Sequence, residues 1–371
     1  MPDELHMNPE EFRDLGRKLL DYIADYRERV GSFPVLSRVG PGEVAAKLPK
    51  EPPACGDSLE GILEDIDEIV MPGITHWQHP SWFAYFPANA SPPSVLAELA
   101  SAGLGVQGML WSTSPAATEI ESHVLDWLVE MLDLPNSWRT TEKGGGVLQM
   151  SASDSTHTAL VVARHEAAKL GVPSESMVAY ASTQAHSSIQ KGATVAGYGH
   201  VRLIEVDAKQ AMRTDALRQA IEDDRSNGLT PIFVGATVGT TGTTGVDPVR
   251  SIGEICAAEM LWLHVDAAYA GNAMICPEFR HHQDGLELAN SYTFNPHKWM
   301  MVNFDCSVFY VADRAPLIDC LSILPPYLKN EASSSGAVID YRDWHVPLGR
   351  RFRALKLWWV IRSYGTAGLR S

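Results

Sequence analysis

Two charged side chains in the second half of the chain have positions that suit covalent catalysis. Asp266 ends the apolar stretch Leu261–Val265 and is followed by two alanines. Thirty-two positions later, Lys298 stands in the turn Asn295-Pro296-His297-Lys298-Trp299, just past another apolar stretch. A buried carboxylate must be paired with a cation to stay ionised. A lysine in such a turn is poorly placed for a merely solvated side chain and suits a nucleophile.

Two further motifs bring an imidazole and a possible anion site to the ends of other predicted strands. His186, in Gln184-Ala185-His186-Ser187-Ser188, follows the predicted strand Met177–Ala181. The segment Gly144–Ser155 combines a glycine-rich approach, a short strand and a serine-rich turn that opens a helix. Free N–H groups in such a turn can hold a phosphate, although a plain serine N-cap would explain this segment taken alone.

Together these groups match the needs of one cofactor, pyridoxal 5′-phosphate. That cofactor requires a lysine for its Schiff base, an anion beside the pyridine nitrogen, a stacking ring and helix-terminus donors for its phosphate. The competing motifs are weaker. Gly103–Gly108 satisfies G-x-G-x-x-G, but no strand leads into it, so a dinucleotide site is rejected. His76 and His79 have a spacing that could bind a metal, but Pro80 and the surrounding aromatic residues favour a loop and no third ligand is near, so we expect no metal.

The elements that must position these residues follow from hydrophobic periodicity. From Gly144 onward, short β-branched runs alternate with helical stretches, which predicts βαβ units, a mostly parallel sheet and an α/β fold. Ligands bind at the carboxyl ends of the strands in such sheets. Helices are predicted at Leu59–Val70, Pro93–Ala102, Pro115–Leu132, Ser155–Leu170, Thr214–Asn227 and Pro248–Met260. Strands are predicted at Val147–Met150, Met177–Ala181, Val201–Val206, Ile232–Val238, Leu261–Val265, Ser291–Phe294 and Ser307–Val311.

The N-terminal region reads as a helical arm. Apolar residues recur at three- and four-residue steps from Asn8 to about Arg29, with Asn8 and Pro9 suited to N-cap and N1. A proline-rich connector follows from Phe33 to Pro53. An arm on an extended linker favours packing on a second subunit slightly over packing on its own domain.

Composition and charge exclude several classes of protein. The 371 residues are 45% apolar and 20% charged, as in an ordinary globular protein. With 30 basic and 45 acidic residues, the net charge of −15 disfavours nucleic acid and anionic membrane surfaces as partners. The five cysteines are widely spaced with no C-x-x-C motif, and we find no signal peptide, so we expect a cytoplasmic protein.

Several motifs closely resemble those of the group II pyridoxal-phosphate-dependent decarboxylases, and among these the aromatic-L-amino-acid decarboxylases. The resemblance runs from the N-terminal helix to the last residue with matching order and spacing. The motifs are His79–Pro87, Gln184–Ser188, His264–Gly271, Phe294–Trp299 and Pro347–Arg353.

The resemblance implies fold type I, with a seven-stranded sheet covered by helices on both faces. It also implies a homodimer whose active site lies at the subunit interface. We expect an N-terminal arm and linker at residues 1–80 and a large cofactor-binding domain at 81–371. The family normally continues for roughly another domain of ~100 residues, so its small C-terminal domain is expected to be absent or only begun here.

Roles for individual residues are also implied by the resemblance. Lys298 would carry the cofactor as a Schiff base, Asp266 would pair with the pyridine N–H, and His186 would stack on the ring. Tyr327, in a loop expected to close over substrate, would donate a proton to the product carbon. The phosphate or its surroundings would be held by Ser151, Ala152, Ser153, Asn295 and His297, with Thr241 and Ala268 lining the cofactor. Substrate would be contacted by Trp77, Tyr85, Phe86, Pro87, Gly349 and, from the partner subunit, positions Gln107 and Met109.

The expected activity is decarboxylation of tryptophan, tyrosine, phenylalanine or DOPA to the arylalkylamine and CO2. Relatives that form aldehydes typically replace the loop tyrosine with phenylalanine or the stacking histidine with asparagine. Both Tyr327 and His186 are present, which favours simple decarboxylation. Two alternatives stay open, an aldehyde-forming oxidative decarboxylase and a silent remnant that binds cofactor or a partner subunit. A nicotinamide dehydrogenase is nearly excluded.

Overall fold

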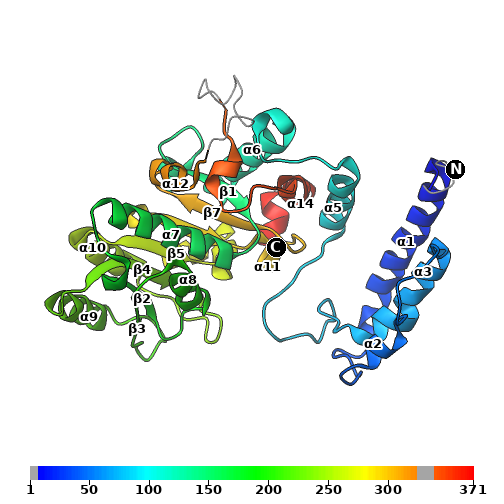
Figure 1. Ribbon diagram of the computed structural model, residues 1–371, viewed down its shortest axis with the longest axis horizontal. Coiled ribbons are helices and arrows are strands. Elements are labelled where there is room, and N and C mark those ends of the chain that lie inside the picture. Colours follow the sequence, from blue (N-terminus) through cyan, green and yellow to red (C-terminus); the bar gives the residue numbers. More distant parts are fainter. Residues whose placement is uncertain (1–6, 324–337) are drawn as a thin grey trace. The chain divides into compact units, whose positions relative to one another are not determined.

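A computed structural model describes residues 7–323 and 338–371, which divide into two compact units (Figure 1). The first unit runs to Pro87 and the second from Ala88 to Ser371. The boundary that the sequence predicts after residue 80 therefore falls inside the first unit.

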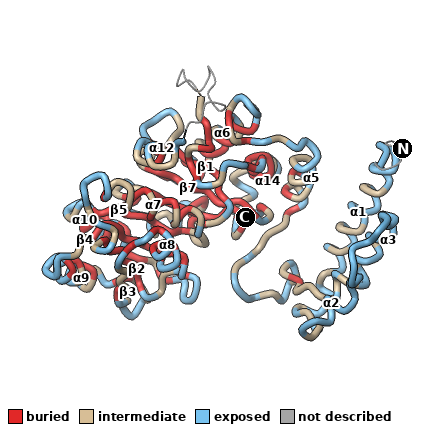
Figure 2. Tube along the Cα trace, viewed as in Figure 1, coloured by how far each residue is buried: buried red, intermediate tan, exposed pale blue. Residues whose placement is uncertain are grey.

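The first unit consists of one long helix, α1, several short helices and the loops that connect them. The long helix α1 begins at Pro9 because Asn8 caps it, accepting from the amides of Glu10 and Glu11 while the Glu11 carboxylate accepts from the Asn8 amide. The predicted amphipathic helix is thus confirmed, yet none of its residues is buried (Figure 2). The helices of the first unit are α1 (Pro9–Arg29), α2 (Glu43–Lys47), α3 (Leu59–Asp65), a π turn (Ile66–Val70) and α4 (Met71–Gly73).

The second unit is built on a seven-stranded sheet in the order β1-β7-β6-β5-β4-β2-β3. Strand β7 is antiparallel to both neighbours, β1 and β6, whereas the other pairings are parallel. All seven predicted strands are present, with ends that shift by a few residues. They are β1 (Gly145–Gln149), β2 (Met177–Ser182), β3 (His200–Ile204), β4 (Thr230–Thr237), β5 (Trp262–Asp266), β6 (Ser291–Phe294) and β7 (Ser307–Val311).

Helices cover this sheet, and every residue of β1, β2, β6 and β7 is buried, so both faces of the pleat are packed. Helix α7 begins at Ala152, earlier than predicted, because the Ser151 hydroxyl caps it by accepting from the Asp154 amide. The helices are α5 (Pro92–Leu104), α6 (Pro115–Met131), α7 (Ala152–Lys169), α8 (Ser188–Ala196), α9 (Thr214–Ser226), α10 (Val249–Glu259), α11 (Pro296–Trp299), α12 (Ala315–Leu321) and α14 (Arg353–Arg370). Short 3-10 turns lie at Val30–Ser32, Trp111–Thr113, Asn136–Trp138, Ser174–Ser176, Ala270–Ile275, Pro277–Gln283, Leu286–Leu288 and Tyr341–Trp344.

A buried ion pair fastens β1 to the C-terminal part of the second unit. The Arg350 guanidinium lies 2.6 Å from Glu121 Oε1 on α6, and the two side chains are only 2% and 3% exposed. The same Glu121 oxygen accepts from the Leu148 amide of β1 at 2.8 Å, and Arg350 donates to the Leu148 carbonyl at 3.1 Å. Because each charge is buried, each depends on the other for compensation.

Replacing Glu121 by alanine should lower the free energy of unfolding by about 3–5 kcal/mol, because the Arg350 charge would stay buried without a partner. Urea unfolding of the two proteins measures this difference. Glu130 offers a matched control on the same helix, since it pairs with Arg139 at 3.7 Å but is 80% exposed. Glu130→Ala should change the unfolding free energy by about 1 kcal/mol or less. Equal losses from the two substitutions would contradict the assignment.

Candidate functional site

Asp266 and Lys298 are placed by two neighbouring strands. Asp266 is the last residue of β5, and Lys298 lies on the one-turn helix α11 that follows β6. These strands are parallel, with Asp266 opposite Thr293 of β6, so both side chains lie at the carboxyl edge of the sheet. The structure therefore brings together the carboxylate and the amine that the sequence singles out.

Burial and mutual attraction set the charge states of this pair. Burial raises the pKa of Asp266, and the nearby positive charges of Lys298 and His186 oppose that rise. Burial likewise lowers the pKa of Lys298, while the Asp266 carboxylate opposes the shift. A lowered pKa increases the fraction of Lys298 present as the neutral, nucleophilic amine.

The carboxylate of Asp266 has one engaged and one available oxygen. The Ala268 amide donates to Oδ1 at 2.9 Å, which fixes the orientation of the carboxylate. Within residues 7–323 and 338–371, no group donates a hydrogen bond to Oδ2. An available anionic oxygen at the end of a buried strand suits a protonated ring nitrogen.

Several buried polar atoms around this edge have no partner in the described part of the chain. They include the hydroxyls of Ser182 and Thr237, at the ends of β2 and β4, and the side-chain oxygens of Asn272 and Asn295. Thr237 is directly opposite Asp266 in the sheet register. Buried polar atoms in native proteins are normally hydrogen-bonded, so such a group of unpartnered atoms points to a polar ligand.

The predicted phosphate segment opens α7 at the same edge of the sheet. Strands β1 and β6 are both antiparallel to β7, and are therefore parallel to each other. Ser151 caps the helix, Ala152 is buried and Ser153 is exposed. The amides of the first helical turn have no intrahelical acceptor, and they suit an anion.

His297 is buried beside Lys298 and its tautomer is fixed. Its ring Nδ1 accepts from the Cys306 amide at 3.0 Å, and its own amide donates to the Cys306 carbonyl at 3.3 Å. Burial and the charge of Lys298 lower the pKa of His297 to about 4. At neutral pH the ring is therefore uncharged and carries its proton on Nε2.

The remaining predicted cofactor residues differ in how far they are exposed to solvent. His186 is exposed in the turn after β2, where its Nδ1 accepts from the Ser188 amide at 3.2 Å. Thr241 is exposed in the turn after β4, Ala268 is half-buried beside Asp266, and Asn295 is buried next to α11. Tyr327 lies outside the described residues.

The predicted substrate residues form two sets, one in each unit. In the first unit, Trp77 stacks on Tyr85 with ring centroids 5.6 Å apart and meets Phe86 edge-on at 5.4 Å; Pro87 ends that unit. In the second unit, Gln107 Oε1 accepts from the Arg350 amide at 3.2 Å, beside the exposed Gly349. The half-buried Met109 accepts through its carbonyl from the Arg342 amide.

The donor set as a whole fits pyridoxal phosphate. It offers a half-buried amine for the aldehyde, a carboxylate oxygen for the ring nitrogen and helix-terminus amides for the phosphate. Sequence reasoning missed the contributions of Thr237 and Asn272. Thr237 is the next-to-last residue of the predicted strand Ile232–Val238 and lies opposite Asp266, and its place near the strand end was the available signal for that residue.

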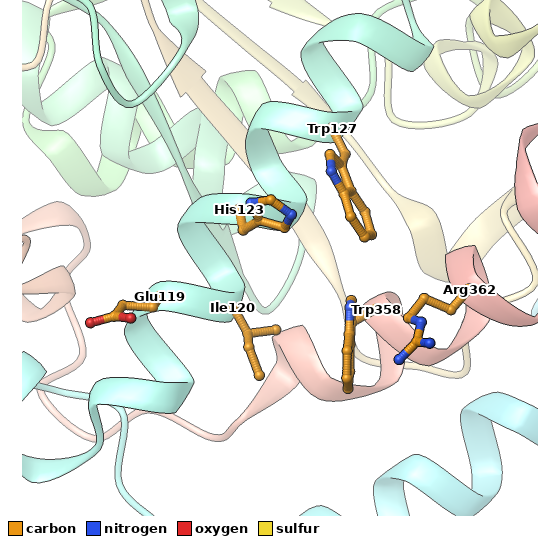
Figure 3. A pocket seen from close by; sticks show the side chains of 6 residues that line it. All are labelled: Glu119, Ile120, His123, Trp127, Trp358 and Arg362. Carbon is orange, nitrogen blue, oxygen red and sulfur yellow. The ribbon is translucent and has the colours of Figure 1, made fainter.

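A separate surface pocket of about 490 Å³ lies between α6 and α14 (Figure 3). Its side chains already contact one another or their neighbours. Arg362 lies 4.9 Å from the centre of the Trp358 ring, His123 packs edge-on against Trp127, and Glu119 accepts from the Trp111 indole. None of the predicted site residues lines it. The lining residues are Glu119, Ile120, His123, Trp127, Trp358 and Arg362.

Comparison with known proteins gives consistent matches. Residues 41–371 match the family described as pyridoxal-dependent decarboxylase conserved domain. Tyrosine decarboxylase 2 of Narcissus pseudonarcissus is 47% identical over 371 residues, covering 98% of this chain and 74% of the relative. Phenylacetaldehyde synthase of Arabidopsis thaliana is 45% identical, covering 98% and 76%. The crystal structure of Oryza sativa TDC with PLP and tryptamine superposes with a TM-score of 0.96 at 41% identity, covering 98% and 76%.

Proposed function

Because the chain belongs to the pyridoxal-dependent decarboxylase family, with fold type I architecture and pyridoxal phosphate as cofactor, we propose that it decarboxylates aromatic L-amino acids to arylalkylamines and CO2. The observation that carries the proposal is the pair formed by the buried Asp266 and the half-buried Lys298 at one edge of the sheet. The substrate class is supported by relatives whose names specify tyrosine or tryptophan.

Each group of the pair has a distinct task in this proposal. When bound, the cofactor supplies an electron sink for the bond between Cα and the carboxylate. Lys298 would hold the cofactor through its amine, whose pKa is lowered by desolvation, which favours the neutral form. Asp266 would favour a positive charge on the ring nitrogen, since its Oδ2 accepts no hydrogen bond from the described residues.

Other residues bind and orient. The amides at Ser151, Ala152 and Ser153 take the phosphate, with Asn295 and His297 beside it, and Thr241 and Ala268 line the ring. His186 stacks on the cofactor ring. His297 contributes a neutral donor at Nε2, because Cys306 occupies Nδ1. The proton that replaces CO2 on the product carbon is assigned to Tyr327.

We assign the binding of the substrate's aromatic ring to the cluster of Trp77, Tyr85 and Phe86, with Pro87 at its end. We propose that the active enzyme is a homodimer with the site at the subunit interface, where Gln107, Met109 and Gly349 complete the substrate pocket. Exposed apolar side chains of the first unit support this assembly, among them Phe12 (62% exposed) and Ile62 (47%).

None of the helices in the described residues is long and apolar enough to span a membrane. The expected cytoplasmic location remains a proposal, supported by the five cysteines, all of which are free thiols.

The proposed function is tested by a competition assay on the cofactor-loaded protein. Tryptophan, tyrosine, phenylalanine and DOPA are supplied at equal concentrations, and amines, aldehydes, ammonia, peroxide and CO2 are measured over time. We expect amine and CO2 in equal amounts, with ratios of specificity constants that rank the four substrates.

Other results would separate the alternatives. Aldehyde formed together with ammonia would favour an aldehyde-forming enzyme, the activity named for the Arabidopsis thaliana relative. Cofactor bound without any product would contradict the decarboxylase and favour a silent cofactor-binding protein.

A further inference from the structure

Three polar side chains just before and within the start of α5 hold the main chain that follows Lys298. Asn89 Nδ2 donates to the Lys298 carbonyl at 2.6 Å, and the Ser91 hydroxyl donates to the Met301 carbonyl at 2.5 Å. The Ser94 hydroxyl contacts the Asn303 side chain and accepts from the Asn303 amide at 2.9 Å. We call Asn89, Ser91 and Ser94 the 89–94 brace.

The main chain at Lys298 needs such support because regular structure ends there. Helix α11 has only four residues, so the Lys298 carbonyl lies at the helix end, where no further turn supplies a donor. Three residues after Lys298, Met301 has a φ of 58°, in the left-handed region. That conformation is unfavourable for a non-glycine residue and persists only where surrounding contacts enforce it.

The brace is itself rigidly mounted. Ser91 is 2% exposed and Ser94 is fully buried. Helix α5 packs along α14. Glu98 of α5 places its Oε2 2.7 Å from the ammonium of the buried Lys356 of α14. Ser94 therefore ties Asn303 to a helix that is anchored in the core, and Asn89 contacts Lys298 from the segment that leads directly into that helix.

We propose that Asn89 is a positioning residue for Lys298. By holding the Lys298 carbonyl, it fixes the main chain from which the amine extends, and hence the distance and angle at which the amine meets the cofactor aldehyde. This inference rests on the role proposed above for Lys298. Misplacement of a reacting group by about 1 Å can cost about 100-fold in rate, so one main-chain hydrogen bond can matter.

The test compares Asn89→Ala and Asn89→Gln with the wild-type protein. Asn227→Ala is the matched control, because Asn227 Nδ2 also donates to a main-chain carbonyl, that of Asp223 at 2.8 Å, at the exposed end of α9. For each protein we would measure kcat and KM. On the same preparations we would measure the thermal unfolding midpoint. We would also measure the rate at which borohydride fixes pyridoxal phosphate to the apoprotein.

We expect Asn89→Ala to lower kcat by about 10-fold or more and to slow the borohydride-dependent attachment, with KM changed by about 2-fold or less. Asn89→Gln retains an amide donor on a longer stem and should recover part of the loss. Asn227→Ala should match wild type in kcat and attachment rate.

Unchanged kcat and attachment rate in Asn89→Ala would overturn the proposal. So would losses that match a lower unfolding midpoint and vanish when rates are expressed per folded molecule. Should the alanine variant fail to fold, Asn89→Gln decides the question by the same two rates. If the wild-type protein forms no product at all, the proposed function fails, yet the attachment rate still reports whether Asn89 positions Lys298.

Discussion

Substituting Lys298 with alanine is expected to abolish covalent attachment of pyridoxal phosphate and to reduce kcat by about 10⁴-fold or more, as for removal of other catalytic nucleophiles. The half-buried Lys298 amine is suited to attach to the cofactor aldehyde, and desolvation lowers its pKa, which favours the reactive neutral form. Borohydride reduction followed by mass spectrometry of the protein measures attachment directly, independently of turnover.

The exposed Lys209 provides the control for this experiment. Lys209→Ala should retain both the borohydride-fixed cofactor and the wild-type rate. A cofactor adduct that still forms in the Lys298→Ala protein at the wild-type level would refute the assignment, since another lysine would then carry the cofactor.

Asp266→Asn is expected to lower kcat by about 10²–10³-fold, because the neutral amide cannot hold a positive charge on the ring nitrogen. The substitution keeps an oxygen for the Ala268 amide, so the local main chain should be preserved. Steady-state kinetics and circular dichroism together would distinguish lost electrostatics from lost structure. Asp284, paired with Arg250 at the surface, gives the control Asp284→Asn, which should leave kcat unchanged.

The same variant should also change the pH dependence of cofactor attachment. The Asp266 carboxylate raises the pKa of Lys298 against the larger, opposite effect of burial. Its removal therefore lowers the pKa of Lys298 further, and the acidic limb of the attachment-rate profile should move to lower pH. A limb that stays in place, or moves to higher pH, would contradict the electrostatic coupling between these two residues.

Much of this architecture is predictable from local sequence patterns. The β-branched runs predicted all seven strands, and Asn8 and Pro9 predicted the start of α1. The motifs around Asp266 and Lys298 predicted that these two side chains lie at the same edge of the sheet, because parallel strands place their carboxyl ends at one edge. The order of the strands in the sheet and the direction of β7, which is antiparallel to β1 and β6, were not specified by any such pattern.

Contacts between distant segments could not be predicted in this way. Asn89 lies 209 positions from the carbonyl that it holds, and Glu121 lies 229 positions from Arg350. Such pairs depend on how helices cross the sheet, and no short motif records that arrangement. The exposure of His186 was likewise not evident, because its motif fixes the strand that it follows rather than what covers it.

The lack of buried apolar side chains in the first unit has a consequence for biosynthesis. Between residues 7 and 87, His76 is the only buried residue, so this stretch cannot form a core by itself. Ribosomes nevertheless complete it before they begin the sheet. We therefore expect this segment, which is translated first, to acquire lasting structure only when its exposed apolar side chains become covered. Until its apolar side chains are covered, we expect its helices to be a target for chaperones and proteases. The yield of folded protein in the cell would then depend on how fast these side chains become covered.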